Sequence, residues 1–217
     1  MTQPTASLSS TSGAGVGTAV ATVAGTVVAG SIGVGGNGAA YVFVKPSGGW
    51  VSTTQPTATL TASDENSIDR FGSSVAISGA TLVVGAPFHP SFAPGTAYVF
   101  IEPPGGWTDM TQTAELSVPT NVTLEFGTSV AVEGNVVLAG APLAIIGANA
   151  QGSLYGYVKP STGWANSNTP NGFVTASPGE AQEEFGSSVA VSGKTFVVGA
   201  PHDGDALQGA AYIFALQ

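Results

Sequence analysis

The sequence has no cysteine and few charged side chains. The absence of cysteine excludes disulfides, thiolate metal sites and a cysteine nucleophile. Only 4 Lys and Arg stand against 13 Asp and Glu, so the formal net charge is −9. Because phosphate backbones and anionic lipids repel such a surface, we expect no nucleic acid and no membrane insertion among its interactions.

The residues and motifs that usually carry catalysis are also scarce. The two histidines, His89 and His202, stand at non-equivalent positions of the repeats described below, and histidine is the commonest general base near neutral pH. The chain has no nucleophile elbow and no zinc signature. No helical pattern follows the glycines of residues 30–38, as a phosphate-binding loop would require. The sequence therefore predicts a protein that is not an enzyme.

Long apolar runs are missing as well. The most apolar stretch, Val16 to Val34, is interrupted by Gly and Thr, and residues 1–12 lack the basic start and apolar run of a secretion signal. Turn-forming residues, by contrast, are abundant, with 31 Gly and 14 Pro in a chain that is 43% hydrophobic. This combination is typical of many short strands joined by tight turns, and it predicts an all-β fold.

The main feature of the sequence is an internal repeat. Three units begin at Phe71, Phe126 and Phe185, and a degenerate copy begins at Val16, so complete units are 55 to 59 residues long. In the second unit, SSVAIS, TLVVGA, TAYVFIE and TQTAELS predict four antiparallel strands. Four such units predict a β-propeller of four four-stranded blades in a single domain, residues 1–217. The expected blades are about 16–70, 71–125, 126–184 and 185–217.

The two ends of the chain complement each other. Residues 2–10 (TQPTASLSS) match residues 54–62 (TQPTATLTA), the fourth strand of the first unit, whereas the last unit stops after its third strand. We therefore expect residues 1–15 to supply a closing strand that pairs with the last blade and removes its exposed edge. Two chains that pair into eight blades are the alternative, so the chain is expected to be a monomer or a homodimer.

The Phe-Gly and Gly-Ala-Pro landmarks resemble FG-GAP repeats, the family that includes the integrin α-subunit propeller and many bacterial surface proteins. They stand at Phe71–Gly72 with 85–87, at 126–127 with 140–142, and at 185–186 with 199–201. The resemblance implies an extracellular or cell-surface protein that acts in adhesion or ligand binding. Two departures stand out: the first copy has Val16–Gly17 and Gly30–Ser31–Ile32 at these landmarks, and the integrin members close seven blades.

A propeller chain changes face at every turn, and this sorts the charges. The term acidic face denotes the side of the propeller that carries two kinds of loop: those that enter each blade, and those between the second and third strands. It is expected to hold nine of the 13 carboxylates: Asp64, Glu65, Asp69, Glu125, Glu180, Glu183, Glu184, Asp203 and Asp205. Arg70 is the one cation expected among them. Asp64, Glu65, Asp69, Glu125 and Glu183 are candidate ligand-binding residues, and the alternative is that they only solvate this face.

A metal site is a further hypothesis for the same face. Asp203 and Asp205 have the alternate spacing with which loop carboxylates hold calcium. Calcium is therefore the candidate cofactor, and these two residues are its candidate ligands. None of the loops has the acid-rich pattern of the integrin-like calcium loop, so the family's ligands are not carried over.

The loops between second and third strands differ completely between copies. Phe88, His89 and Phe92 in one copy, and Leu143, Ile145 and Ile146 in another, are candidate contacts for a protein or glycan ligand; capping of the central channel is the alternative. Trp50, Trp107 and Trp164 recur at one repeat position, where they either pack between blades or stack on sugars as in a lectin. A structural module of a larger surface assembly is the third functional hypothesis.

Overall fold

The protein is all-β in the computed structural model, as the sequence predicts. The structure describes residues 3–12, 14–33, 37–64, 68–89, 94–119, 125–177, 179, 181–204 and 208–216. Every regular element in these ranges is a β-strand, and none of the described residues forms a helix long and apolar enough to span a membrane.

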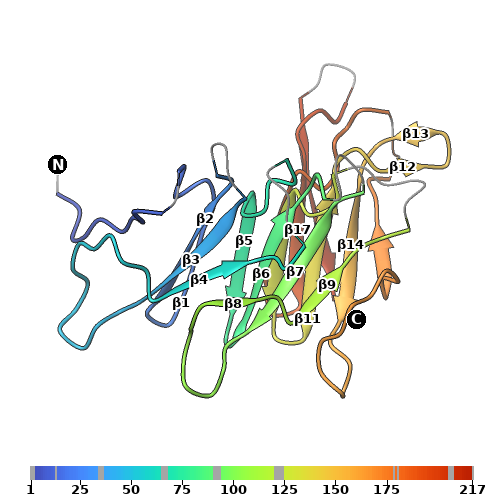
Figure 1. Cartoon of the computed structure of the whole chain (residues 1–217). Coiled ribbons are helices and arrows are strands. Elements are labelled where there is room, and N and C mark those ends of the chain that lie inside the picture. Colours follow the sequence, from blue (N-terminus) through green and yellow to red (C-terminus); the bar gives the residue numbers. More distant parts are fainter. Residues whose placement is uncertain are drawn as a thin grey trace.

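Four antiparallel sheets follow one another along the chain (Figure 1). The first contains β1 (Val20–Val23), β2 (Thr26–Ser31), β3 (Ala39–Val44) and β4 (Ala58–Thr61), with β8 (Met110–Thr111) added at its outer edge in parallel. The second contains β5 (Ser74–Ser78), β6 (Thr81–Ala86), β7 (Thr96–Ile101) and β9 (Ala114–Leu116). The third contains β10 (Ser129–Glu133), β11 (Val136–Ala141), β14 (Ser153–Val158) and β15 (Gly172–Val174). The last contains β16 (Ser188–Ser192), β17 (Thr195–Ala200) and β18 (Ala210–Ala215). A two-stranded hairpin, β12 (Ile145–Ile146) and β13 (Asn149–Ala150), lies in the loop after β11.

Each sheet is an up-and-down meander whose first two strands are joined by a glycine turn. Gly79, Gly134 and Gly193 have φ values of 54°, 55° and 57°, which glycine adopts without a steric penalty. The second and third strands are buried on both faces in the inner sheets; β6, for example, is buried along its whole length. Such strands lie between neighbouring sheets, so the core is built from the contacts between blades.

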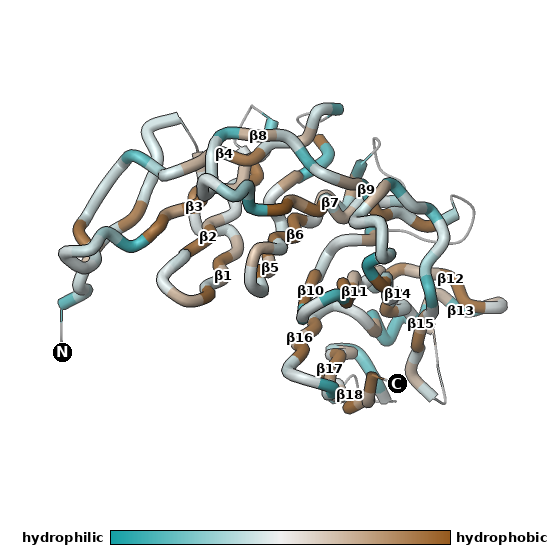
Figure 2. Tube along the Cα trace, turned by 90° about the horizontal axis from the view of Figure 1, so that it is seen from below, coloured by the Kyte–Doolittle hydropathy of each residue, from teal (hydrophilic) through white to brown (hydrophobic). Residues whose placement is uncertain are grey.

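The sheets are arranged around an arc, with their first strands innermost (Figure 2). β1 contacts β5, β5 contacts β10, and β10 contacts β16. One hydrophobic cluster joins the first and second sheets, a second joins the second and third, and a third joins the third and last. A fourth cluster, around Tyr41 and Phe43, lies on the side of the first sheet that faces away from the second.

The glycines of the repeat landmarks lie where consecutive blades touch. A Cβ on Gly85 would lie 1.9 Å from the carbonyl oxygen of Gly127, and a Cβ on Gly140 would lie 2.0 Å from that of Gly186. The first glycine of each pair belongs to a Gly-Ala-Pro landmark, and the second belongs to the Phe-Gly of the next blade. The two landmarks thus bring the backbones of consecutive blades closer than any side chain would allow.

The four sheets do not close into a ring within the described residues. Residues 3–12 do not pair with β18; instead Leu8 forms a parallel bridge with Thr53, beside the first sheet. No ladder or bridge among the described residues joins the first sheet to the last, and Figure 2 shows the two ends of the arc apart. The expected pairing of the closing strand with its own last blade is therefore not seen in this structure. The last sheet has three described strands, with β18 at its edge.

Candidate functional site

The acidic face is built on a turn that is repeated at the entry of each blade. Arg70, Glu125 and Glu184 directly precede the Phe-Gly landmark and have φ values of 57°, 62° and 56°. The carbonyl oxygen of each accepts a hydrogen bond from the hydroxyl of the Ser or Thr three residues later, at 2.7 Å in all three turns. The turn therefore fixes these charged residues in equivalent positions on three neighbouring blades.

The three charges influence one another. Burial raises the pKa of Glu125 above its usual value, the negative charge of Glu184 raises this pKa further, and Arg70 opposes both effects. Arg70 also lies over the ring of Phe88, 4.7 Å from the centroid, a cation–π arrangement. A partly buried carboxylate beside a second carboxylate is a favourable place for a positively charged group.

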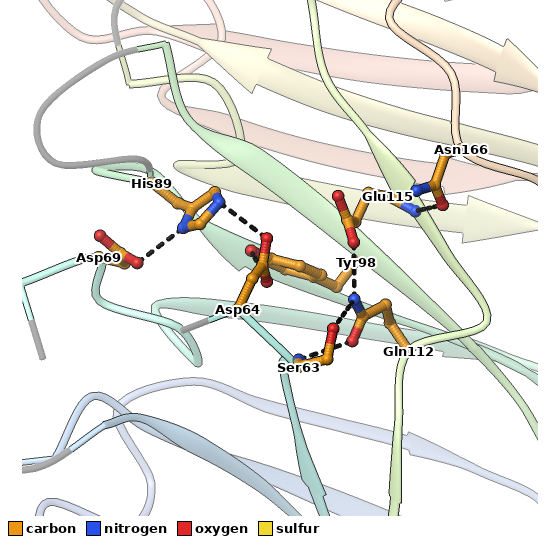
Figure 3. A network of polar contacts seen from close by, with 8 residues as sticks. All are labelled: Ser63, Asp64, Asp69, His89, Tyr98, Gln112, Glu115 and Asn166. Carbon is orange, nitrogen blue, oxygen red and sulfur yellow. Dashed lines mark hydrogen bonds and ion pairs between the residues drawn. The ribbon is translucent and has the colours of Figure 1, made fainter. Parts of the chain in front are cut away.

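A second cluster bridges the loops of the second blade (Figure 3). His89 Nδ1 lies 2.7 Å from Asp69 Oδ2, and His89 Nε2 lies 3.1 Å from Asp64 Oδ2. Asp69 is buried and His89 is nearly so, whereas Asp64 is 41% exposed. Both ring nitrogens thus face carboxylate oxygens, so neither is open to accept a proton from a substrate.

Tyr98 holds this cluster from below. Its hydroxyl donates to Asp64 Oδ1 at 3.1 Å, and its ring is buried against Phe71 and the His89 imidazole. Burial raises the pKa of Tyr98 far above its usual range, and the charge of Asp64 adds to the effect. The hydroxyl therefore stays protonated and serves as a donor that orients Asp64.

Amide and hydroxyl groups continue the network along the outer strands. The side-chain amide of Gln112 donates to Ser63 Oγ at 2.9 Å and to Glu115 Oε1 at 2.7 Å, and its oxygen accepts from the Ser63 backbone N–H at 2.9 Å. Asn166 Oδ1 accepts from the backbone N–H of Glu115 at 3.0 Å. Figure 3 shows these groups beside Asp64 and Tyr98. Because they connect the fourth strands of two blades, they stabilise the scaffold of the site.

The last blade carries a related arrangement with different residues. Tyr212, which corresponds to Tyr98 in the repeat, donates its hydroxyl to Asp203 Oδ2 at 2.5 Å. That hydrogen bond, with a smaller effect of burial, raises the pKa of Tyr212 to about 12. Glu183 is buried, and His202 Nδ1 lies 3.2 Å from Glu184 Oε1 at the surface.

The described residues do not form a ligand set for calcium at these positions. Within the ranges that the structure describes, no group of three or more His, Asp or Glu side chains is placed to hold a metal ion. Asp203 lies against Tyr212, and Asp205 lies outside the described residues, as do Glu65, Glu180 and Phe92.

The apolar loop candidates differ in exposure. Ile145 is 42% exposed at the start of the β12–β13 hairpin, whereas Ile146, Leu143 and Phe88 are half-buried. The hairpin is joined to the entry of the last blade, since the Gln182 backbone N–H donates to the Ala150 carbonyl at 2.8 Å. The exposed Ile145 therefore belongs to the same end of the molecule as the Glu184 turn.

Two of the three recurring tryptophans pack between blades, and the third packs on the outer side of the first sheet. Trp107 and Trp164 are 4% and 8% exposed and belong to the clusters that join neighbouring sheets, and Trp50 packs beside Tyr41 and Phe43. A sugar cannot stack on the two buried rings, so the packing interpretation of these residues is the one that the structure supports.

Sequence reasoning did not assign a role to the tyrosines below the acidic face. Tyr98 and Tyr212 orient Asp64 and Asp203, and both follow a Gly-x-Ala sequence at the start of the third strand. Their recurrence at this repeat position is visible in the sequence. Their hydrogen-bond partners are not, because those come from different loops: the entry to the second blade in one case, and the loop after β17 in the other.

The architecture is similar to that of solved structures of designed proteins. The fold is similar to that in the crystal structure of the computationally designed Ika4 protein, with a TM-score of 0.56 and 17% sequence identity over 100% of both chains. A further match, the computationally designed Ika8 protein, has a TM-score of 0.36 and 13% identity over 96% of this chain and 74% of its own. No curated protein matches the sequence. The Ika4 likeness and the successive antiparallel sheets define a propeller-type repeat module.

The repeat itself is identified by a family model. The model described as FG-GAP repeat matches residues 55–100 and 172–214. These two stretches are FG-GAP repeats, so the resemblance expected from the sequence is confirmed there.

Proposed function

We propose that this chain is a non-catalytic binding module, and that its acidic face recognises a protein ligand through basic side chains. The observation that carries the proposal is the position of Glu125. Its carboxyl is half-buried, and its pKa is raised by burial and by Glu184. A lysine or arginine of a ligand placed between these two carboxylates would relieve their repulsion and form charge-assisted hydrogen bonds.

The surroundings of the two carboxylates support the same proposal. The net charge of −9 steers a cationic ligand toward the molecule. The β12–β13 hairpin offers the exposed Ile145 beside the Glu184 turn, and apolar contacts next to charges are typical of protein-recognition surfaces. A role in adhesion at the cell surface or outside the cell is part of the proposal and rests on the family resemblance.

A non-catalytic role is favoured by the state of His89. Both of its nitrogens are engaged by carboxylates, so this imidazole is a structural bridge between two loops. The lectin alternative loses its main support because Trp107 and Trp164 are buried. A structural module within a larger assembly is the third functional hypothesis.

The proposal is tested with a short Lys- and Arg-rich peptide, whose binding is measured by titration calorimetry at low and high salt. We expect salt-sensitive binding by the wild type, and a loss of about tenfold in affinity in the double variant Glu125→Gln/Glu184→Gln, equivalent to about 1.4 kcal/mol. Glu133→Gln is the matched control, since Glu133 is exposed at the end of β10 on the opposite face. Equal binding by the wild type and the double variant would contradict the proposal.

The metal alternative has its own measurement. Thermal melting is followed with calcium and with a chelator. If calcium does not change the melting temperature, this measurement gives no support to a metal ion as the ligand, and the calorimetry alone tests the binding of the basic peptide. A melting temperature that rises with calcium, and no longer does so in Asp203→Asn, would replace the cationic peptide by a metal ion as the ligand of this face.

A further inference from the structure

The contacts between the blades follow one rule. The term socket denotes the three groups that one blade offers to the next: the glycine of Gly-Ala-Pro, the glycine before the third strand, and the serine at the second position after Phe-Gly. The socket of the second blade consists of Gly85, Gly95 and Ser74. It receives the Phe126–Gly127 turn: Ser74 Oγ donates to the Gly127 carbonyl at 2.8 Å, and Gly95 forms a parallel bridge with Phe126.

The next junction repeats this geometry. Ser129 Oγ donates to the Gly186 carbonyl at 2.7 Å, Gly152 forms a parallel bridge with Phe185, and a Cβ on Gly140 would collide with the Gly186 oxygen. A Phe-Gly turn of one blade therefore fills the socket of the preceding blade by backbone contacts that require glycine.

The last blade has the same socket, and no turn of the described residues occupies it. Its members are Ser188, Gly199 and Gly209, and they line an open cavity of ≈ 600 Å³ together with Pro201 and Ala211. A Cβ on Gly199 would meet Ser188 of the same blade and no atom of another blade. Gly199 is equivalent to Gly85 and Gly140, where the contact with the following blade requires glycine. The last blade therefore has this glycine although no blade follows it in the described structure.

The first blade carries a turn that contacts no socket within the described part of the chain. Val16–Gly17 corresponds to the Phe-Gly turns, and Gly17 has φ 96° with no heavy atom within 4 Å of a Cβ position. Val20 on the adjacent strand is 70% exposed, whereas its counterparts Val75 and Val130 are 9% and 7% exposed. This side of the first blade matches the sides that other blades bury.

The segment of residues 3–12 is held as the outer strand of a preceding blade. Leu8 bridges Thr53 in parallel, as Leu60 pairs with Met110 and Leu116 with Ser167. The Ser7 backbone N–H donates to Ser52 Oγ at 3.0 Å, just as Thr59 and Glu115 donate to Asp109 and Asn166. The positions 8, 60 and 116, and likewise 53, 110 and 167, are equivalent in the repeat.

The matching open edge belongs to β18. Its Ile213 is 74% exposed, whereas the equivalent Val42 and Val99 are 0% exposed beneath a following blade. By the register of Ala40 with Leu60 and of Ala97 with Leu116, Leu8 would pair with Ala211. In the described structure Leu8 bridges Thr53 beside the first sheet, and the N-terminal segment and β18 lie at opposite ends of the arc (Figure 2), so the strand and the edge of one chain do not meet.

We infer that two copies of this chain close into one ring of eight blades. Each copy inserts its Val16–Gly17 turn into the socket of Ser188, Gly199 and Gly209 of the other copy, and adds residues 3–12 as an outer strand to the other copy's β18. A two-fold axis makes the two junctions identical, so the assembly closes and leaves no free edge. The inference depends on the blade contacts alone and is independent of the ligand proposed above.

The first test is the solution mass of the full chain by light scattering across a range of concentrations. We expect a dimer for the wild type and a folded monomer for Ile213→Glu, because a charge at the junction would be buried there but is exposed in the isolated chain. Val158→Glu, at an exposed position of the third blade, is the matched control and should remain dimeric. A monomeric wild type, or a dimer that persists in Ile213→Glu, would overturn the inference.

A second test uses the absence of cysteine. The double variant Leu8→Cys/Ala211→Cys is oxidised and its mass read on a denaturing gel without reductant. We expect a disulfide-linked dimer, since opposed residues of paired strands are close enough for a disulfide. Ala40→Cys/Leu60→Cys, the equivalent pair within one chain, should give an intrachain disulfide. An intrachain disulfide between positions 8 and 211 would show closure of four blades and overturn the inference, as would free thiols at both positions.

Discussion

At the scale of single residues, the acidic face combines a buried cluster with exposed charges. Asp69 is 1% exposed and its carboxylate lies against the His89 imidazole. A buried charge without its partner is costly, so His89 has a structural role in the loop where the sequence predicted a ligand contact. His202 provides the contrast, because it and Glu184 form their ion pair at the surface.

Replacing His89 should therefore destabilise the protein. We expect His89→Ala to lower the free energy of unfolding by about 2 kcal/mol, since it removes a charged hydrogen bond from a buried carboxylate. His202→Ala is the control and should cost less than about 1 kcal/mol. Urea unfolding followed by tryptophan fluorescence measures both, and equal effects of the two substitutions would contradict the assigned role of His89.

The stability of the fold should depend on the protonation of Glu125. Because its pKa is raised in the folded state by burial and by Glu184, the folded protein binds this proton more tightly than the unfolded chain does. Stability is then highest below the ordinary Glu pKa and decreases as the pH rises toward the raised pKa of the folded state.

The measurement is a melting curve between acidic and neutral pH. Glu125→Gln should melt at a higher temperature than the wild type at neutral pH, and the advantage should disappear in acid. Glu133→Gln, at an exposed position, should show no such pH-dependent gain. A Glu125→Gln variant that is less stable than the wild type at neutral pH would show that the carboxylate is favourable there.

At the scale of elements, glycine decides how closely two blades approach. The Phe-Gly turn of one blade and the Gly-Ala-Pro strand of the preceding one meet backbone to backbone, so the landmarks that define the repeat are also its contact points. Gly156 on β14 is different, since a Cβ there would meet Leu138 Cδ2 at 3.5 Å and the Gly172 carbonyl oxygen at 3.9 Å, both ordinary contact distances. The same residue type thus has a structural role at one position and is replaceable at another.

This contrast gives a matched pair of substitutions. Gly140→Ala places a Cβ 2.0 Å from the Gly186 oxygen, which forces the third and last blades apart; we expect a loss of about 3 kcal/mol in the free energy of unfolding. Gly156→Ala should change it by less than about 1 kcal/mol. Denaturant unfolding measures the free energy of unfolding of both variants. If Gly140→Ala is as stable as Gly156→Ala, the close approach of Gly140 to Gly186 does not contribute to the packing of the blades.

At the scale of the whole molecule, the two ends of the arc are complementary to each other, because one carries a strand and the other an unpaired sheet edge among the described residues. The segment of residues 3–12 is bound by the first blade in the geometry of an outer strand, while β18 lies at an open edge. Deletion of residues 1–12 should therefore remove the closing strand and lead to dissociation of the assembly or to aggregation through the exposed edge of β18. Light scattering and thermal melting of the truncated chain measure this, and an unchanged mass with an unchanged melting curve would show that the segment closes nothing.

Much of this architecture could be predicted from the sequence, since its signals are local and repeated four times. The alternation in SSVAIS and TLVVGA, the glycine turns and the recurring landmarks fix strands, turns and the number of units, because each depends on neighbouring residues. The prediction of an acidic face rests on the rule that the chain changes face at each turn. The partners of Asp64, Asp69 and Asp203 could not be predicted, because the hydrogen bonds of these residues join loops or strands that only the packing of the sheet brings together.

The sequence by itself determined that the chain is an all-β protein of FG-GAP repeats, and that residues 2–10 repeat the fourth strand of the first unit. Only the tertiary structure decided where that segment lies. The match to residues 54–62 shows which strand this segment resembles. Whether the segment reaches the edge of β18 depends on the rotation from each blade to the next. That rotation is set by the packing of large and small side chains between sheets, and in this fold it places residues 3–12 and β18 at opposite ends of an open arc.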